Sequence, residues 1–341
     1  PVASAPVDQD SSGYRSYVLG MLLLVYVLNF VDRQIIGILV EPIKAYFAAA
    51  GNPVTDTQMG LLGGLAFALF YTVLGIPLAW LADRFNRVWI ITIALGVWSG
   101  FTVLCGMATT YWGLLIARIG VGAGEAGGSP PSQSLISDYF PPNKRASALS
   151  IWALGIPIGS AVGVVLGAWV AKEYGWQMAF IVAGVPGLIV ALIFKMTIKE
   201  PKRGRFDPPN AKPEMPTLKE TFTAILGKPT FWIVAMGCAV ASFVGYATFV
   251  WGAAYFVRNF DLAPTIGEET LIVSYFSAFI IGIAASIGTI IGGRLADRFG
   301  QKDIRAYVTI PAIALILAVP LNIWGLSVND AFLAAAIVLI P

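Results

Sequence analysis

The chain has 341 residues and a net charge of +3, with 57% hydrophobic and 12% charged residues. Soluble domains carry about 25% charged residues, so this composition excludes a soluble globular protein and indicates an integral membrane protein. The sequence contains no histidine, which excludes a histidine-ligated metal site and leaves proton chemistry within the membrane to carboxylates. We therefore expect no metal, no cofactor and no nucleic-acid partner.

Long apolar runs follow one another along the chain, each long enough to cross a bilayer as a helix. The runs lack strand alternation, so the expected fold class is all-α. We predict nine full transmembrane helices, at residues 17–40, 58–81, 88–108, 111–137, 146–171, 177–198, 229–257, 270–293 and 306–326. A tenth begins near Ala331, but the stretch to Pro341 is too short to span. We therefore expect the last helices, and the residues before Pro1, to be missing from this sequence.

The placement of basic residues predicts the orientation of the helices. If the N-terminus is cytoplasmic, 17 of the 22 Lys and Arg residues lie in cytoplasmic segments. Three lie on the opposite side: Lys44, Lys172 and Arg258. Because cytoplasmic loops carry an excess of Lys and Arg, we predict a multi-pass protein of the inner membrane with a cytoplasmic N-terminus.

A long polar segment, from Lys199 to Lys228, separates the sixth predicted span from the seventh. Within it, Thr217 and Glu220 have the spacing of a capping box, and apolar residues follow at helical intervals. This pattern predicts a short amphipathic helix on the cytoplasmic membrane surface. The segment divides the chain into an N-terminal half of six helices (1–198), a cytoplasmic linker (199–228) and a C-terminal half with helices seven to ten (229–341).

A five-residue sequence occurs twice, after the second predicted span of each half. It reads Leu-Ala-Asp-Arg-Phe at residues 81–85 and again at residues 295–299. A parallel repeat of two helical halves places a substrate site between them, near the middle of the membrane. With this loop in both halves and a six-plus-six plan, the chain resembles the transporters of the major facilitator superfamily.

The resemblance implies the major facilitator fold, an all-α integral membrane fold of two six-helix halves, the second of which is incomplete here. It also implies that the repeated loop acts as a gate on the cytoplasmic side. A loop that merely follows the positive-inside rule would explain the basic residues but not the repeated Asp. The expected gating-loop residues are Asp83, Arg84, Arg87, Arg145, Asp297 and Arg298.

Ionisable residues lie inside the first and fourth predicted spans. Charged side chains at mid-membrane cost about 2.5–3.5 kcal/mol each, so they persist where they face water, a partner or a substrate. By helical rise, the four charges fall in one layer about 10 Å thick: Asp32, Arg33, Arg118 and Glu125. Asn29 precedes Arg33 by four residues and shares its helical face. Either two ion pairs lock the spans together, or the residues form a site in the transport pathway. Buried charge pairs often stabilise no better than apolar packing, which favours the pathway.

The two residue types predict different roles in such a site. Arg33 and Arg118 can hold an anionic head group, because the planar guanidinium binds phosphate or carboxylate bidentately. Burial favours the neutral form of a carboxyl group, so Asp32 and Glu125 are the candidate proton carriers. Protonation of an acid frees a neighbouring arginine for the substrate, which links proton and substrate occupancy.

Small residues predict which helices pack closely. On the fourth span, Gly120, Gly124 and Gly128 form a small-residue stripe of the kind that lets helix backbones approach. We expect this stripe to pack against the fifth span, where glycines recur every four residues, at Gly155, Gly159, Gly163 and Gly167.

Aromatic residues gather on the seventh span, at Tyr246, Phe249 and Trp251. Such a stripe either packs internally or, facing a charged N-terminal half, receives the apolar tail of an amphipathic anion. The second interpretation predicts that Phe249→Ala or Tyr246→Ala loses long-chain substrates but retains small ones.

Three motifs together resemble a narrower family, the Spinster-type branch, as a bacterial member: residues 29–33, 122–126 and 137–141. Members of that branch carry lysophospholipids or sphingosine-1-phosphate, with proton coupling in some. The resemblance implies binding and coupling roles for Asp32, Arg33 and Glu125.

We interpret the chain as a monomeric, proton-coupled secondary transporter of an amphipathic anion, such as a lysophospholipid or a sphingosine-1-phosphate-like lipid, that works by alternating access. The alternative is a transporter of a small organic anion, such as a sugar phosphate or hexuronate, that uses the same arginines. An intramembrane hydrolase based on Ser129 would lack a histidine base. We therefore expect a transporter and not an enzyme.

Overall fold

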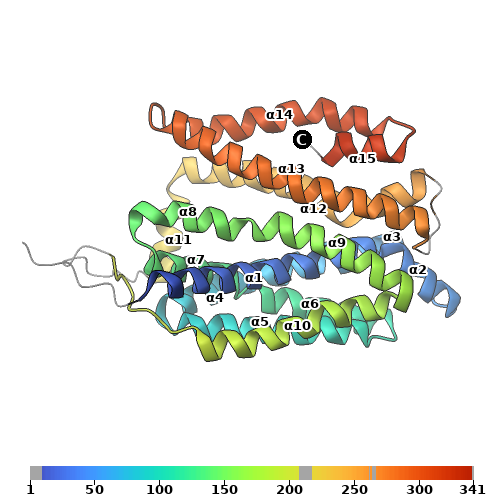
Figure 1. Ribbon diagram of the computed structural model, residues 1–341, viewed down its shortest axis with the longest axis horizontal. Helices are drawn as coiled ribbons and strands as arrows, with labels where there is room; N and C mark the ends of the chain where they lie inside the picture. Colours follow the sequence, from blue (N-terminus) through green and yellow to red (C-terminus); the bar gives the residue numbers. More distant parts are fainter. Residues whose placement is uncertain (1–9, 207–216, 261, 263–265, 340–341) are drawn as a thin grey trace, which may run out of the picture.

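The structure is a computed structural model that describes residues 10–206, 217–260, 262 and 266–339, and within these ranges the regular structure is helical. The helices run side by side along the long axis of the molecule (Figure 1). The N-terminal half contains α1 (Ser12–Ile38), α2 (Val40–Ala49), α3 (Asp56–Gly60), the π-helix η1 (Leu61–Leu65), α4 (Ala66–Arg84), α5 (Arg87–Gly106), α6 (Tyr111–Glu125), α7 (Ser129–Tyr139), α8 (Pro142–Ala153), α9 (Gly155–Tyr174) and α10 (Trp176–Thr197). The linker helix is α11 (Leu218–Leu226), and the C-terminal half contains α12 (Pro229–Asn259), α13 (Glu268–Gly300), α14 (Ala306–Leu326) and α15 (Ala331–Leu339).

In the part of the chain that the structure describes, eight helices are long and apolar enough to cross a membrane. The sequence predicts nine, and the difference lies in the fourth span. That span is divided after Glu125 into α6, of 15 residues, and α7, of 11 residues. Gly127 and Gly128 favour helix poorly, and Pro130 and Pro131 occupy the first turn of α7, where proline is tolerated. The prediction of one unbroken helix over 111–137 is therefore wrong.

The two halves lie beside each other, with α12–α15 on one side of α8 and α9 and the rest of the N-terminal half on the other (Figure 1). The largest buried hydrophobic cluster lies in the N-terminal half and includes Leu22 of α1, Trp98 of α5 and Phe180 of α10. Two long helices of the N-terminal half meet the C-terminal half: α9 packs against α13, and α1, which also packs against α9 and α10, packs against α12.

The glycine stripes pack against helices other than those expected. A β-carbon at Gly124 would lie 2.6 Å from the backbone nitrogen of Trp98, and one at Gly120 would lie 2.4 Å from the ring of Phe101. Both neighbours belong to α5. The glycine row of α9 instead approaches α1, where a β-carbon at Gly159 would lie 2.5 Å from the carbonyl oxygen of Val27. The expected pairing of the fourth span with the fifth is thus wrong. The glycines of α6 pack against side chains and backbone of α5, and those of α9 pack against α1.

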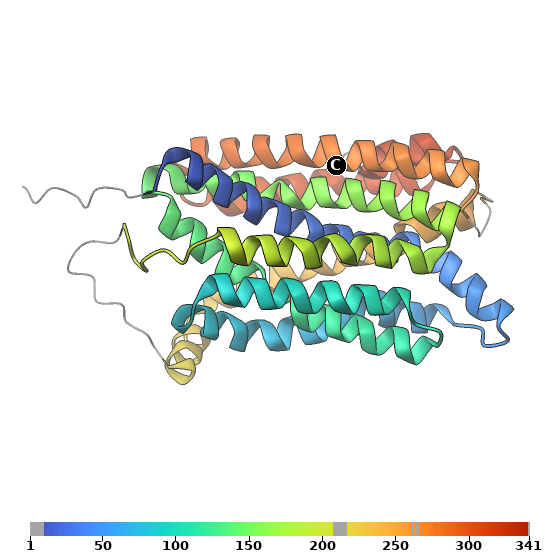
Figure 2. The ribbon, with the colours of Figure 1, turned by 60° about the horizontal axis from the view of Figure 1, so that its bottom comes forward.

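The two ends of the bundle differ. The linker end holds the start of α1, the turn between α4 and α5, and α11 (Figure 2). The α2 end holds α2, α3, the end of α12 and the start of α13 (Figure 1). At the linker end, α11 begins with a capping box in which the Thr217 hydroxyl accepts a hydrogen bond from the Glu220 backbone, and Glu220 accepts one from the Thr217 backbone. That backbone hydrogen bond lowers the pKa of the Glu220 carboxyl.

Candidate functional site

The four intramembrane charges come together, and each pairs with a residue of the other helix. The Nε of Arg33 in α1 donates a hydrogen bond to Oε2 of Glu125 in α6 over 2.6 Å. An Nη1 of Arg118 in α6 lies 3.6 Å from Oδ1 of Asp32 in α1. All four residues are buried, with exposed fractions between 1% and 8%. The helical rise brings the four charges to one level, and the packing of α6 near α1 turns them toward each other.

Aromatic rings from α1 and α4 surround Arg33. Its guanidinium carbon lies 4.7 Å from the ring centre of Tyr71 and 5.1 Å from those of Phe30 and Phe67. Phe67 also lies 5.4 Å from the guanidinium of Arg118, so one ring contacts both cations. Cations over aromatic faces are attracted by the ring quadrupole, more strongly where water is excluded. Sequence reasoning missed Phe67 and Tyr71; their i, i+4 spacing on the second predicted span was the available signal.

The aromatic residues of α12 have different positions. The hydroxyl of Tyr246 accepts a hydrogen bond from Nη1 of Arg33 over 3.1 Å and thereby links the charged cluster to the C-terminal half. Phe249 and Trp251 line a separate cavity farther toward the α2 end. Asn29 is buried near the cluster on α1, and its Oδ1 has no hydrogen-bond partner among the described residues.

The hydrogen-bonding capacity of the charged cluster is not filled by the described residues. Both carboxylate oxygens of Asp32, the Oε1 of Glu125, and the Nε and Nη1 of Arg118 have no hydrogen-bond partner among them. A buried ion pair that serves only stability needs good geometry and additional hydrogen bonds to offset the loss of hydration. This cluster therefore has unused donors and acceptors of both signs, which a proton and an anion can use.

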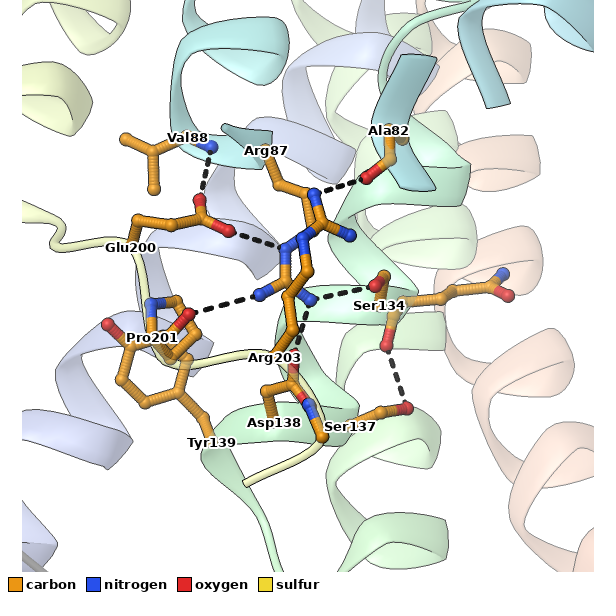
Figure 3. A network of polar contacts seen from close by, with 12 residues as sticks. Ala82, Arg87, Val88, Ser134, Ser137, Asp138, Tyr139, Glu200, Pro201 and Arg203 are labelled. Carbon is orange, nitrogen blue, oxygen red and sulfur yellow. Dashed lines mark hydrogen bonds and ion pairs between the residues drawn. The ribbon is translucent and has the colours of Figure 1, made fainter. Parts of the chain in front are cut away.

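A second polar cluster lies at the linker end, around Arg87 (Figure 3). Arg87 is fully buried and donates hydrogen bonds to Glu200 over 2.7 Å, to Ser134 over 2.8 Å and to Asp138 over 2.5 Å. Glu200 also accepts a hydrogen bond from the backbone of Val88 at the start of α5, where the helix dipole favours an anion. Sequence reasoning placed Arg87 in a gating loop but did not identify its partners.

The first residues of the predicted linker complete this cluster. Arg203 donates to the carbonyl oxygen of Ala82 (Figure 3) and also to that of Phe85. Both carbonyl groups are left without helical partners where α4 ends. Gly204 has a φ of +63°, which glycine adopts without strain, and its backbone donates to Asp138. The segment 199–206 therefore folds onto the N-terminal half and holds α4, α5 and α7 together.

The other expected gating residues are placed as follows. Asp83 and Arg298 are exposed, Arg84 lies with its guanidinium 4.1 Å from the ring centre of Trp80, and Arg145 donates to the carbonyl oxygen of Ser137. The side chain of Asp297 lies outside the described residues. The partners of Arg87 named above belong to the N-terminal half and the linker, so its contacts rigidify that half. A role of the repeated loop as a gate stays a prediction.

At the α2 end, ion pairs join the two halves. The guanidinium of Arg258 in α12 donates hydrogen bonds to both carboxylate oxygens of Asp56 in α3, over 2.8 and 2.9 Å. It also forms an ion pair with Glu41 of α2 over 2.7 Å. Lys172 of α9 pairs with Glu268 of α13. The sequence indicated that Lys172 and Arg258 lie on the side opposite the linker, but it gave no sign that each would pair with the other half.

The backbones of the two halves also meet at this end. A β-carbon at Gly37 of α1 would lie 2.5 Å from the carbonyl oxygen of Phe249 in α12. Real β-carbons do not approach a backbone oxygen so closely, so the contact of α1 with α12 requires glycine at this position. The α2 end is therefore closed by a backbone contact within the bundle and by ion pairs at its surface.

Comparisons with known proteins agree with this architecture. Residues 22–340 match the family model of the Major Facilitator Superfamily. An MFS-type efflux pump of Mycolicibacterium smegmatis is 29% identical over 98% of this chain and 75% of its own length. The sphingosine-1-phosphate transporter SPNS2 of Danio rerio is 30% identical over 87% of this chain, which spans 60% of that relative's length.

Solved structures give the same result. The crystal structure of a bacterial homologue of the human lysosomal transporter Spinster, in an inward-facing and unoccupied conformation, matches with a TM-score of 0.77. The sequence of that homologue is 35% identical to this chain, and the match covers 97% of this chain and 74% of the homologue's chain. The occupied, inward-facing structure of such a homologue matches with a TM-score of 0.73.

Proposed function

Since the chain belongs to the major facilitator superfamily and to its Spinster-type branch, we propose that it is a proton-coupled secondary transporter that moves an amphipathic anion by alternating access. The observation that carries the proposal is the buried cluster of Asp32, Arg33, Arg118 and Glu125. Its four charges cancel when all are ionised, yet several of their polar atoms have no hydrogen-bond partner among the described residues. A purely structural pair of ion pairs does not account for these unused atoms.

Charge balance links the proton to the anion. An anionic head group that binds Arg33 or Arg118 adds negative charge to a buried, neutral cluster, which is costly. Protonation of Asp32 or Glu125 restores neutrality and releases an arginine for the head group. Proton and anion therefore favour each other's binding, and by linkage the effect is reciprocal.

The surroundings of Arg33 support an amphipathic substrate. Phe30, Phe67 and Tyr71 enclose its guanidinium, and apolar and aromatic residues of α12 follow on the side of the α2 end. A small, strongly hydrated anion gains little from such walls, whereas an alkyl chain is removed from water by them. The similarity to a sphingosine-1-phosphate transporter agrees with this assignment.

Alternating access requires one end of the bundle to close while the other opens. The ion pairs of Arg258 and Lys172 and the contact at Gly37 close the α2 end. We assign the linker end to the cytoplasm of the inner membrane, in keeping with the excess of basic residues there. The state described here is then inward-facing, like that of the bacterial Spinster homologue.

Transport in proteoliposomes tests the proposal. Oleoyl lysophosphatidic acid serves as the probe, and its uptake under a pH gradient is compared with exchange at equal pH. Arg33→Ala is expected to lose both activities, whereas Asp32→Asn and Glu125→Gln are expected to lose gradient-driven uptake and keep exchange. Glu269→Gln, an exposed acid outside the cluster, is the matched control. Wild-type proton-dependent flux in all three cluster variants would refute the proposal.

Chain-length dependence separates the amphipathic substrate from the small anion. Glucose 6-phosphate and glucuronate are tested beside a series of lysophosphatidic acids of increasing chain length. We expect affinity to rise with chain length and Phe249→Ala to weaken the longer members selectively. Uptake of the small anions alone would assign the same arginines to a small organic-anion transporter.

A further inference from the structure

The cavity lined by Phe249 and Trp251 lies between α1, α12, α13 and α14, on the side of the α2 end. It has a volume of about 340 Å³, and its wall includes Gly37 and Trp251. None of the four charged residues of the central cluster contributes to this wall. The cavity nevertheless begins close to the cluster, because Gln34 and Gly37 in its wall follow Arg33 by one and four residues on α1. At about 1.5 Å per residue, four residues correspond to one helical turn.

The face of α13 that lines the cavity carries hydroxyl groups at helical spacing. Thr270, Ser274 and Ser277 are i, i+4 and i+7 and so share one face of the helix. Each is more than nine-tenths buried. Ser274 donates a hydrogen bond to the carbonyl oxygen of Thr270, but the hydroxyls of Thr270 and Ser277 have no partner among the described residues. Buried hydroxyls without partners are unfavourable, so these two have a donor and an acceptor to offer a ligand.

The charge of the wall defines the ligand further. Its one carboxylate, Glu41, is paired with Arg258, and neither lysine nor arginine contributes to the wall as described. The rest of the wall is mostly apolar and aromatic. An anionic or cationic group would therefore have no counter-ion here, whereas a neutral chain with a hydroxyl group would fill both the apolar wall and the two hydrogen-bonding positions.

We propose that this cavity binds the neutral part of the transported amphiphile, and that Thr270 and Ser277 recognise a hydroxyl group between its anionic head and its alkyl chain. The proposal rests on the proposed function, since the head group of the same molecule would bind at Arg33. It adds a selectivity that charge alone does not provide. An amphiphile with a hydroxyl at this position binds more tightly than one with hydrogen in its place.

A pair of probes tests the recognition directly. Oleoyl lysophosphatidic acid carries a free glycerol hydroxyl, and its deoxy analogue has hydrogen there. Binding is measured by displacement of a fluorescent lysophospholipid from the full chain in nanodiscs of uncharged lipid. We expect the wild type to prefer the hydroxyl probe about five- to tenfold, the range for about one net hydrogen bond. Thr270→Val combined with Ser277→Ala is expected to abolish the preference.

The matched control is Ser286→Ala, since Ser286 lies on the same helix and donates to the carbonyl oxygen of Gly282. It is expected to keep the full preference. If the double variant fails to fold, Ser277→Ala alone is measured with the same probes. An unchanged preference in the double or single variant would overturn the proposal, as would equal binding of the two probes to the wild type.

Filling the cavity provides an independent test. A β-carbon at Gly252, which lines the wall, would have no atom within 4 Å, so Gly252→Leu can occupy the space without a backbone clash. We expect this variant to weaken both oleoyl probes at least tenfold and to leave glycerol 3-phosphate binding unchanged. Wild-type binding of the oleoyl probes would contradict the cavity assignment. A different result would show that the proposed function is wrong: Arg33→Ala would then bind both probes as tightly as the wild type does.

Discussion

Arg33 of α1 donates one hydrogen bond to Glu125 of α6 and another, over 3.1 Å, to the hydroxyl of Tyr246 in α12. The same guanidinium therefore takes part in the buried ion pairs of the N-terminal half and in a contact with the C-terminal half. An anion that engages Arg33, or a proton that neutralises Glu125, changes what Arg33 offers to Tyr246. This contact connects the proposed binding site directly to the relative position of the two halves.

We expect Tyr246→Phe to reduce gradient-driven uptake about tenfold, because it removes a hydrogen bond to a charged group and leaves the ring in place. The measurement is proton-driven uptake of oleoyl lysophosphatidic acid in proteoliposomes. Tyr275→Phe is the control, since that tyrosine is exposed on α13 and lies outside the cavity wall. Equal uptake by both variants and the wild type would show that the contact has no part in transport.

The pair of Arg33 and Glu125 allows stability to be separated from function. Arg33→Met alone leaves a buried, unpaired carboxylate and is expected to cost about 3–5 kcal/mol of stability. Adding Glu125→Leu removes that carboxylate, and we expect thermal stability to return to the wild-type level or above. Binding of the lysophosphatidic acid probe should be lost in both variants. A double variant that is stable and still transports would show that the pair only locks α1 to α6.

The polar cluster around Arg87 at the linker end is expected to stabilise the N-terminal half. Arg87→Ala leaves Asp138 and Glu200 without their buried cation, so we expect a loss of about 3–5 kcal/mol, measured as a lower Tm in detergent. Lys144→Ala, an exposed cation at the same end, should change the Tm little. A similar Tm for both variants would contradict a structural role for the polar cluster around Arg87.

The close approach at Gly37 predicts how the α2 end opens. A leucine at this position cannot fit against Phe249, so Gly37→Leu is expected to separate α1 from α12 and favour the state that is open at the α2 end. The readout is labelling of a Val250→Cys reporter, buried beside this contact, by a membrane-impermeant maleimide, with Cys238 replaced by serine. Gly20→Leu on the same helix is the control, because a β-carbon there would meet no atom within 4 Å. Unchanged labelling in Gly37→Leu would count against the contact as a seal.

The ion pairs of Arg258 should act at the same end but depend on salt. Arg258→Ala removes the bidentate contact with Asp56 and the contact with Glu41, so we expect a few-fold faster labelling of the Val250→Cys reporter. Because these groups are partly exposed, high salt should accelerate labelling of the wild type and reduce the difference. Arg294→Ala, exposed and far along α13, should behave as the wild type. Equal labelling of Arg258→Ala and the wild type at low salt would show that these ion pairs do not hold the α2 end closed.

Several features of the fold are local enough to be predicted from sequence. The lengths of the apolar runs gave the membrane class and the positions of the helices, except for the fourth span, where Gly127 and Gly128 interrupt the helix. Counting residues along α1 and α6 also placed the four charges at one depth. Both predictions depend on the constant rise of a helix and the thickness of a bilayer, which do not change with tertiary contacts.

What a residue faces depends on how helices rotate and pack, and periodicity does not specify this. The sequence could not pair Arg87 with Glu200, 113 residues away, or Arg258 with Asp56, 202 residues away. Nor could it show that Phe67 lies between two arginines, since an aromatic residue in an apolar span usually packs in the core. Sequence therefore determined which charges enter the membrane and at what depth. The tertiary structure decided which charges meet, because burial makes an unpaired charge costly and only the packed helices bring its partner within reach.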